Sequence, residues 1–116
     1  MHRFKDLEIW KLSRIFCKLI YEITETFPEK EKFGIINQMR RASVSIPSNI
    51  AEGASRKSNK DFSRFLEIAI GSCYELETQL LIAKNLDYIS DIELDMLLND
   101  LYQIQKMIFK LKEKLN

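Results

Sequence analysis

Hydrophobic residues recur every three or four positions through most of the 116-residue chain, the spacing that places them on one face of an α-helix. Four stretches carry this pattern. No stretch alternates apolar and polar residues with period two, as a half-buried β-strand would, so the sequence predicts four helices. Their apolar stripes are Ile9, Leu12, Phe16, Leu19, Ile23 and Phe27; Ile35, Met39, Ala42, Ile46 and Ile50; Phe62, Leu66, Ala69, Cys73, Leu76, Leu80 and Ala83; and Leu94, Leu97, Leu101, Ile104, Ile108, Leu111 and Leu115.

Helix-breaking residues place the ends of the first two predicted helices. Pro28 ends the first helix, and the second is predicted over residues 31–52. Pro47 falls inside the second helix and removes one backbone hydrogen bond, so we expect a kink near Ser43, with a helix break there as the alternative. Gly53, or the serine-rich turn that follows it, closes this helix.

The third and fourth helices begin at capping signals. The third opens with Ser58-Asn-Lys-Asp61, a box-like cap, and the fourth with Ser90-Asp-Ile-Glu93, a capping box by residue type and spacing. Near-heptad stripes joined by short connections predict an all-α fold. We expect residues 1–116 to form a single domain, an antiparallel up-down-up-down four-helix bundle.

Composition and chain start narrow the class of protein. The chain is 46% hydrophobic and 30% charged with three glycines and two prolines, which excludes disordered and fibrous proteins and favours long helices. It contains no run of 18 apolar residues and begins with a charged segment instead of a signal peptide. We therefore expect no membrane contact and a cytoplasmic location, where Cys17 and Cys73 act as reduced, small hydrophobic residues.

A polar stripe lies beside the apolar stripe on the second and third predicted helices. If these helices form an antiparallel hairpin that turns near residues 56–59, residues whose numbers add to about 116 lie level. This register sets Arg41 beside Glu75, and Glu52 beside Arg64. We predict a buried polar seam with two structural ion pairs, and an active site is the alternative interpretation. The seam residues are Gln38, Arg41, Ser45, Asn49, Glu52, Arg64, Glu67 and Glu75.

Each predicted helix also carries apolar residues outside its core stripe. A monomeric four-helix bundle has one interior, so a second set of aromatic residues predicts self-association through the helix flanks, unless wide core stripes absorb it. These residues are Leu7, Trp10, Tyr21, Phe65, Ile70, Tyr74, Leu81, Leu98, Tyr102 and Phe109.

Several short motifs carry a resemblance to a known family. They are Phe4…Leu7…Trp10, Thr26-Phe-Pro28, Gln38…Arg41-Ala42…Ser45-Ile-Pro…Asn49-Ile-Ala-Glu-Gly53, Phe62…Phe65-Leu66…Ala69 and Gly71-Ser72…Glu75-Leu76. Over residues 4–89 the chain resembles the 23S rRNA intervening-sequence protein family. The resemblance implies an antiparallel four-helix bundle that assembles as a homopentamer. It also implies a relation to accessory proteins of diversity-generating retroelements, which bind a reverse transcriptase and nucleic acid.

The charges separate when they are placed on the predicted bundle, although the net charge is only +1. Basic residues gather at the end that holds the N-terminus, the second connection and the C-terminus, while acidic residues, Glu67 among them, gather at the other. In a cyclic oligomer the basic ends would form one ring, which suits a phosphate backbone. The basic set is Arg3, Lys5, Lys11, Arg14, Lys18, Arg40, Arg41, Arg56, Lys57, Lys60, Arg64, Lys106, Lys110, Lys112 and Lys114.

The residue inventory gives little support to catalysis. His2 is the only histidine, so the sequence lacks the Glu-x-x-His pairs of a di-iron bundle and a histidine base in the core. We expect no catalytic residue, no metal and no cofactor. The predicted function is a non-catalytic accessory that binds RNA or a ribonucleoprotein, and the alternative is an adaptor whose basic surface docks an acidic protein. The candidate nucleic-acid-binding residues are Arg56, Lys57, Lys60, Lys110 and Lys114, and Arg56, Lys57 and Lys60 lack an acidic partner in the predicted register.

Overall fold

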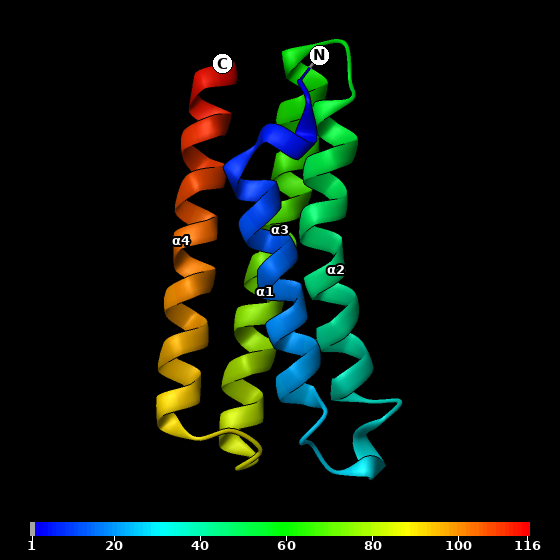
Figure 1. Ribbon diagram of the computed structural model, residues 1–116, viewed down its shortest axis with the longest axis vertical. Helices are drawn as coiled ribbons and strands as arrows, with labels where there is room; N and C mark the ends of the chain where they lie inside the picture. The colour runs from blue at the N-terminus through cyan, green and yellow to red at the C-terminus, as the bar shows by residue number, and fades with distance from the viewer. Residues whose placement is uncertain (1) are drawn as a thin grey trace.

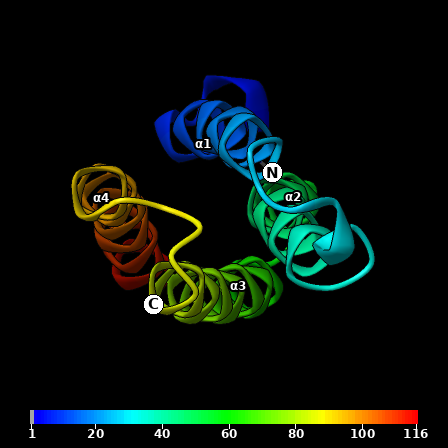
Figure 2. The ribbon, with the colours of Figure 1, turned by 90° about the horizontal axis from the view of Figure 1, so that it is seen from below.

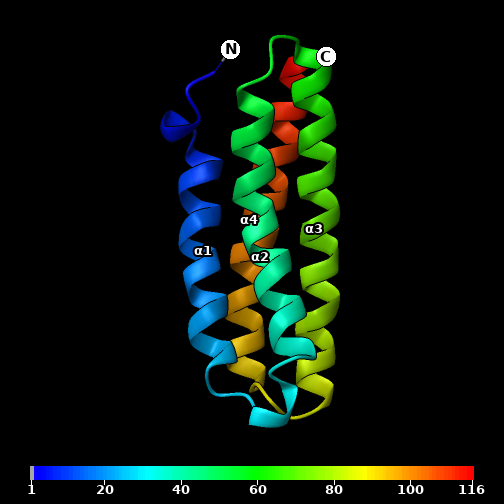
Figure 3. The same ribbon diagram turned by 90° about the vertical axis from the view of Figure 1, so that its right-hand side faces the viewer.

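Four long helices form the protein, seen in a computed structural model that describes residues 2–116 (Figure 1). Consecutive helices run in opposite directions, and the N-terminus, the α2–α3 connection and the C-terminus lie at one end of the bundle (Figures 1 and 3). The predicted all-α up-down-up-down bundle is therefore confirmed. The helices are α1 (Glu8–Thr24), α2 (Ile35–Ala54), α3 (Asn59–Asn85) and α4 (Asp91–Leu115), with short 3-10 helices at Phe4–Asp6 and Glu29–Glu31.

The bounds of α2 differ from the prediction at both ends. The helix begins at Ile35, four residues later than predicted, because Glu29–Glu31 forms a separate 3-10 helix and the backbone of Gly34 is not helical. It then continues across Pro47 to Ala54, so the alternative of a helix break is wrong. Gly53 lies inside the helix and is buried, and α2 ends in the serine-rich turn after it, with Ser55 as the C-cap residue, which is the second of the two predicted endings.

The predicted core stripe is most accurate on α3. All seven predicted core residues of this helix are buried, and so are four of the five on α2, Ile35 being the half-buried exception. On α4 the middle of the stripe, from Leu97 to Ile108, is buried, while Leu94, Leu111 and Leu115 are half-buried at the ends. Cys73 is fully buried, and burial together with the nearby Glu77 carboxylate raises the pKa of its thiol to about 12. This thiol is a structural hydrophobic group, as predicted.

The buried face of α1 is rotated from the predicted one. The helix buries Ser13, Ile20 and Thr24 along with Ile9 and Phe16. The two hydroxyls remain hydrogen-bonded, because Ser13 Oγ donates to the carbonyl of Trp10 at 3.1 Å and Thr24 Oγ1 to that of Ile20 at 2.7 Å. The predicted stripe residues Leu12, Leu19 and Ile23 are only half-buried, on the side that faces α4.

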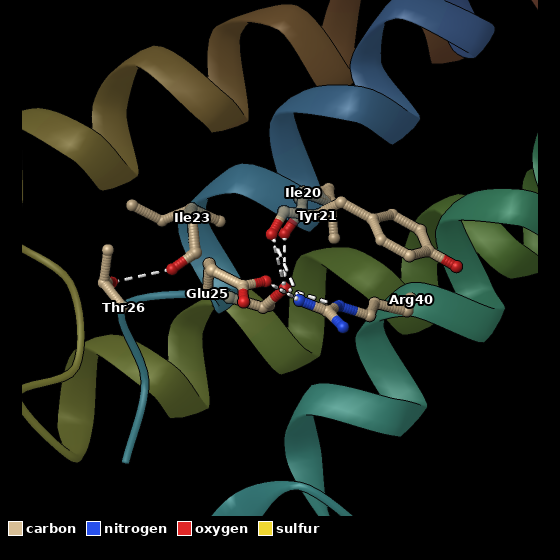
Figure 4. Close-up of polar contacts among 7 residues, drawn as sticks. Ile20, Tyr21, Ile23, Glu25, Thr26 and Arg40 are labelled. Carbon is tan, nitrogen blue, oxygen red and sulfur yellow. Dashed lines mark hydrogen bonds and ion pairs between the residues drawn. The ribbon is translucent and has the colours of Figure 1, made fainter. Parts of the chain in front are cut away.

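A single arginine ties the C-terminal turn of α1 to α2. The Nε of Arg40 donates to Thr24 Oγ1 at 2.9 Å, and its Nη2 donates to the Tyr21 carbonyl at 3.2 Å and to Glu25 at 2.9 Å (Figure 4). A cation at a helix C-terminus is favourable, because the last carbonyls of the helix have no partner within it. Arg40 therefore belongs to the acidic end of the bundle, and its predicted place in the basic set is wrong.

Both predicted caps are present. Ser58 Oγ accepts a hydrogen bond from the Asp61 amide at 3.1 Å. At the start of α4, Ser90 and Glu93 form the complete reciprocal capping box. These caps fix where α3 and α4 begin, and hence the position of the connections at each end. Within the described part of the chain, no helix has the length and apolar character needed to cross a membrane.

Candidate nucleic-acid interface

The α2–α3 hairpin has the predicted register but lacks the predicted buried ion pairs. Ser45 Oγ lies 2.8 Å from Ser72 Oγ, and these residue numbers add to 117. Arg41 and Glu75 are both exposed, and within residues 2–116 they form no ion pair at 4.0 Å or less. The stripe follows the outer face of the hairpin, because the apolar stripes occupy the inner faces.

The remaining seam residues have other partners or remain in solvent. Glu52 binds Arg56 at 3.3 Å and Glu67 binds Lys112 at 3.1 Å, so the predicted Glu52–Arg64 pair is wrong. Asn49 Nδ2 donates within α2, to the Ser45 carbonyl at 2.8 Å. Gln38, Glu52, Arg64 and Glu67 are exposed, whereas Ser45 and Asn49 are half-buried. This arrangement provides neither a buried charge pair nor an enclosed active site.

The α2–α3 connection carries three of the five candidate residues. Lys57 and Lys60 are exposed and, across residues 2–116, neither has a carboxylate oxygen within 4.0 Å. Arg56 is different, because its guanidinium pairs with Glu52 and lies 4.7 Å from the centroid of the Phe65 ring. The prediction that all three lack an acidic partner is therefore wrong for Arg56. Lys57 and Lys60 are the cations that remain free to bind a ligand.

Lys60 lines a hollow between the start of α3 and the end of α4. The hollow has a volume of about 770 Å³, and Arg64 and Lys112 also line it. Its acidic residues are Asp61 and Glu67, so three cations face two carboxylates. The amides of the first turn of α3 add the positive end of a helix dipole to this region. Lys112 is paired with Glu67, so Lys60 and Arg64 are the remaining cations of this hollow, with Asp61 as the other carboxylate.

Lys110 and Lys114 lie on the other side of α4. They line a second hollow, of about 290 Å³, between the end of α4 and the start of α1, where Leu7 and Met107 provide apolar walls and Glu8 a carboxylate. Both lysines are exposed, and no ion pair of 4.0 Å or less involves them in the described chain. The five candidates thus share one end of the bundle (Figure 1) but occupy two sides of α4.

The N-terminal segment crosses this same end and adds a further cation. The His2 amide donates to the carbonyl of Ala54 at 3.0 Å, and the imidazole lies 5.1 Å from the centroid of the Phe62 ring. These contacts hold the segment against the α2–α3 connection. Arg3 follows directly and pairs with Asp6 at 3.5 Å in an exposed position, where such a pair is weak.

Sequence reasoning missed the group formed by Lys60, Arg64 and Lys112, because it compared register only between the second and third helices. The same argument applies to the third and fourth helices. The residue numbers of two observed contacts, Lys84 with Asp91 and Lys112 with Glu67, add to 175 and 179. A register centred on the connection at residues 86–90 would have placed Lys112 level with residues 63–67.

The fold and its surface define a class: an all-α up-down four-helix bundle with lysines at one end that form no ion pair in the described part of the chain. The sequence model of one family, described as "23S rRNA-intervening sequence protein", matches residues 5–110. The chain therefore belongs to the 23S rRNA-intervening sequence protein family.

A solved structure agrees with this assignment. The chain is similar to a protein with unknown function from the S23 ribosomal protein family of Bacteroides thetaiotaomicron VPI-5482, whose crystal structure is known. The two are 25% identical, with a TM-score of 0.84, and the alignment covers 90% of this chain and 95% of the other. No protein of curated function matches the sequence.

Proposed function

We propose that this protein is a non-catalytic accessory that binds RNA, free or within a ribonucleoprotein, through its basic end. The observation that carries the proposal is the set of four exposed lysines at that end that have no carboxylate partner among residues 2–116: Lys57, Lys60, Lys110 and Lys114. An exposed ammonium group is a mobile point charge, which suits contact with phosphate oxygens without base readout. Family membership gives the proposal its RNA context, since the family is described as "23S rRNA-intervening sequence protein".

We propose that the protein is a homo-oligomer, and the family resemblance favours five copies. Assembly would multiply the lysine contacts to RNA. An apolar surface on the outer side of α3 and α4 supports this assembly. Its side chains are all more than 40% exposed: Tyr74, Leu81, Tyr102 and Phe109. Such a surface on a small chain marks an interaction site. In a ring with parallel bundle axes, the basic ends of all copies would lie on one side and attract an RNA backbone together.

Gly71 supports the same proposal. A glycine in the middle of a helix costs about 1 kcal/mol relative to alanine, so its presence requires a reason. That reason is not found within one copy, because a Cβ built on Gly71 meets no atom within 4 Å. Close approach of a neighbouring chain explains an exposed glycine at this position.

Changing Gly71 to glutamine should therefore reduce assembly while it leaves the fold intact. The new side chain has open space in the isolated bundle but would hold a neighbouring helix away. We expect light scattering to give a mass several times 13.7 kDa for the parent and a lower mass for the variant at equal concentration. Circular dichroism should show the same helix content in both. A parent that stays monomeric at micromolar concentration, or a variant that assembles equally well, contradicts the proposal.

Comparing two polyanions tests the binding function. Fluorescence anisotropy would measure binding of the protein to a labelled structured RNA and to labelled poly-glutamate in the same buffer. We expect the RNA to bind at least about tenfold more tightly, a free-energy difference of about 1.4 kcal/mol. Equal or tighter binding of poly-glutamate would favour the adaptor that docks acidic proteins and would overturn the RNA proposal.

A further inference from the structure

The seam between α1 and α4 is open along its length. Viewed along the bundle axis, α2 lies between α1 and α3, and α3 lies between α2 and α4, so α1 and α4 must meet to close the bundle (Figure 2). They pack less closely than the other neighbouring helix pairs do. Three hollows of about 290, 100 and 280 Å³ follow one another along this seam, from the basic end to the acidic end.

The walls of this α1–α4 groove are apolar. Leu12, Leu19 and Ile23 line it from α1, and Met96, Leu97 and Met107 line it from α4. Three of the apolar side chains along the seam remain largely in solvent: Ile15 is 56% exposed, Met96 63%, and Ile92, one turn from Met96, 73%. The rotated face of α1 also directs the predicted stripe residues Leu12, Leu19 and Ile23 toward the groove instead of the core.

The rim of the groove is charged, and its sign changes along the length. At the acidic end, Glu22, Glu93 and Asp100 border the hollow of about 280 Å³, and the residues that line this hollow include no lysine or arginine. All three carboxylates are exposed. At the other end, Lys110 and Lys114 border the groove, with Glu8 as the acidic residue there.

We propose that the α1–α4 groove is the docking site for an amphipathic helix of a partner protein, with lysine or arginine residues at the end that lies over Glu22, Glu93 and Asp100. The apolar face of that helix would complete the core that α1 and α4 leave open, a common mode of peptide recognition. Complementary charges would fix its direction. The span from Glu8 to Glu22 on one helix is about 21 Å at 1.5 Å per residue, which corresponds to about four turns of helix in the partner.

A second copy of this chain is a poorer match to the rim. The apolar surface on α3 and α4 has Glu77 among the aromatic residues, and Tyr102 donates a hydrogen bond to that carboxylate at 2.9 Å. In the groove this surface would bring a carboxylate toward the carboxylates of the acidic end, where like charges repel. A basic helix meets no such repulsion.

A designed peptide tests the proposal with the full chain. The probe is a labelled helical peptide of about five turns with leucines at i, i+4, i+7 and i+11 and lysines at one end. Its control carries the same leucines and has glutamates in place of the lysines. By anisotropy, the parent protein should bind the lysine peptide at least about tenfold more tightly than the control, and methyl spectra should shift at Leu19 and Ile23. Equal binding of both peptides would overturn the proposal.

Two protein variants locate the site. Asp100→Lys should weaken binding of the lysine peptide about tenfold, whereas Glu29→Lys, an equal charge change at the same end but outside the groove, should not. Met96→Gln should weaken both peptides without unfolding the protein, because Met96 is mostly exposed. Unchanged peptide binding by Asp100→Lys would overturn the proposal. So would loss of the self-assembled mass in Met96→Gln, which would show that a second copy occupies the groove.

Discussion

Replacement of Gly53 by leucine should lower the free energy of unfolding by about 3 kcal/mol or more. Gly53 is buried where the last turn of α2 meets the first turn of α3, and a Cβ at this position would lie 2.7 Å from Phe65 Cβ and 2.9 Å from Phe62 Cδ1. Phe65 Cβ is bonded directly to its own backbone and cannot move without α3. The larger side chain therefore forces the two helices apart at the basic end.

Urea unfolding followed by circular dichroism would measure this loss at one protein concentration. Gly53→Ala should lose less, about 1 kcal/mol, because the better helix propensity of alanine offsets part of the overlap. Ser48→Leu is the matched control, since it adds the same side chain at an exposed position of α2 and should change stability by less than about 0.5 kcal/mol. A Gly53→Leu variant as stable as the parent would show that α2 and α3 do not pack closely at this position.

The double variant Lys57→Glu, Lys60→Glu should bind structured RNA about a hundredfold more weakly than the parent, or about 2.7 kcal/mol. Each change removes one phosphate contact and adds one repulsive charge. The fold should not suffer, because both side chains are exposed and neither takes part in an ion pair of the described residues. Arg56 is left unchanged, since its pair with Glu52 and its contact with Phe65 stabilise the connection.

The variant Lys30→Glu, Lys32→Glu provides a control with the same charge change. These two lysines are also exposed and also lie in a connection between helices, but at the opposite end of the bundle. The control should keep most of the RNA affinity, and both variants should melt within a few degrees of the parent. If the two variants lose affinity equally, net charge alone governs binding and the basic end is not the site.

The fold was predictable because the hydrophobic spacing and the capping residues indicate the same helices. On α3 and α4 a capping serine fixes where the helix begins, and the apolar stripe then fixes the buried face. The N-terminal end of α2 was not predictable in this way, because the charged segment before Gly34 has a polar, helix-like composition but forms a 3-10 helix and a turn. On α1, the buried hydroxyls of Ser13 and Thr24 bond to the helix backbone, so these residues are buried where the pattern predicted the neighbouring Leu12 and Ile23.

The polar seam shows where charge spacing misleads. Arg41 and Glu75 have the right register, but register alone does not tell whether two level side chains face the core or solvent. Here the apolar stripes occupy the inner faces, so the polar stripe lies outside, where ion pairs contribute little to stability. The shared end of the five candidate residues follows from the predicted bundle, whereas the hollow that joins Lys60 to Lys112 depends on the packing of α3 against α4.

We propose that phosphate contacts at the basic end hold the protein on RNA. The most direct measurement is the binding constant of the parent protein for a structured RNA at several salt concentrations. Four lysine contacts predict that log K falls linearly with log salt, with a slope of about −3, and more steeply if several copies bind together. A binding constant that does not change with salt, or no binding at low salt, would contradict the account.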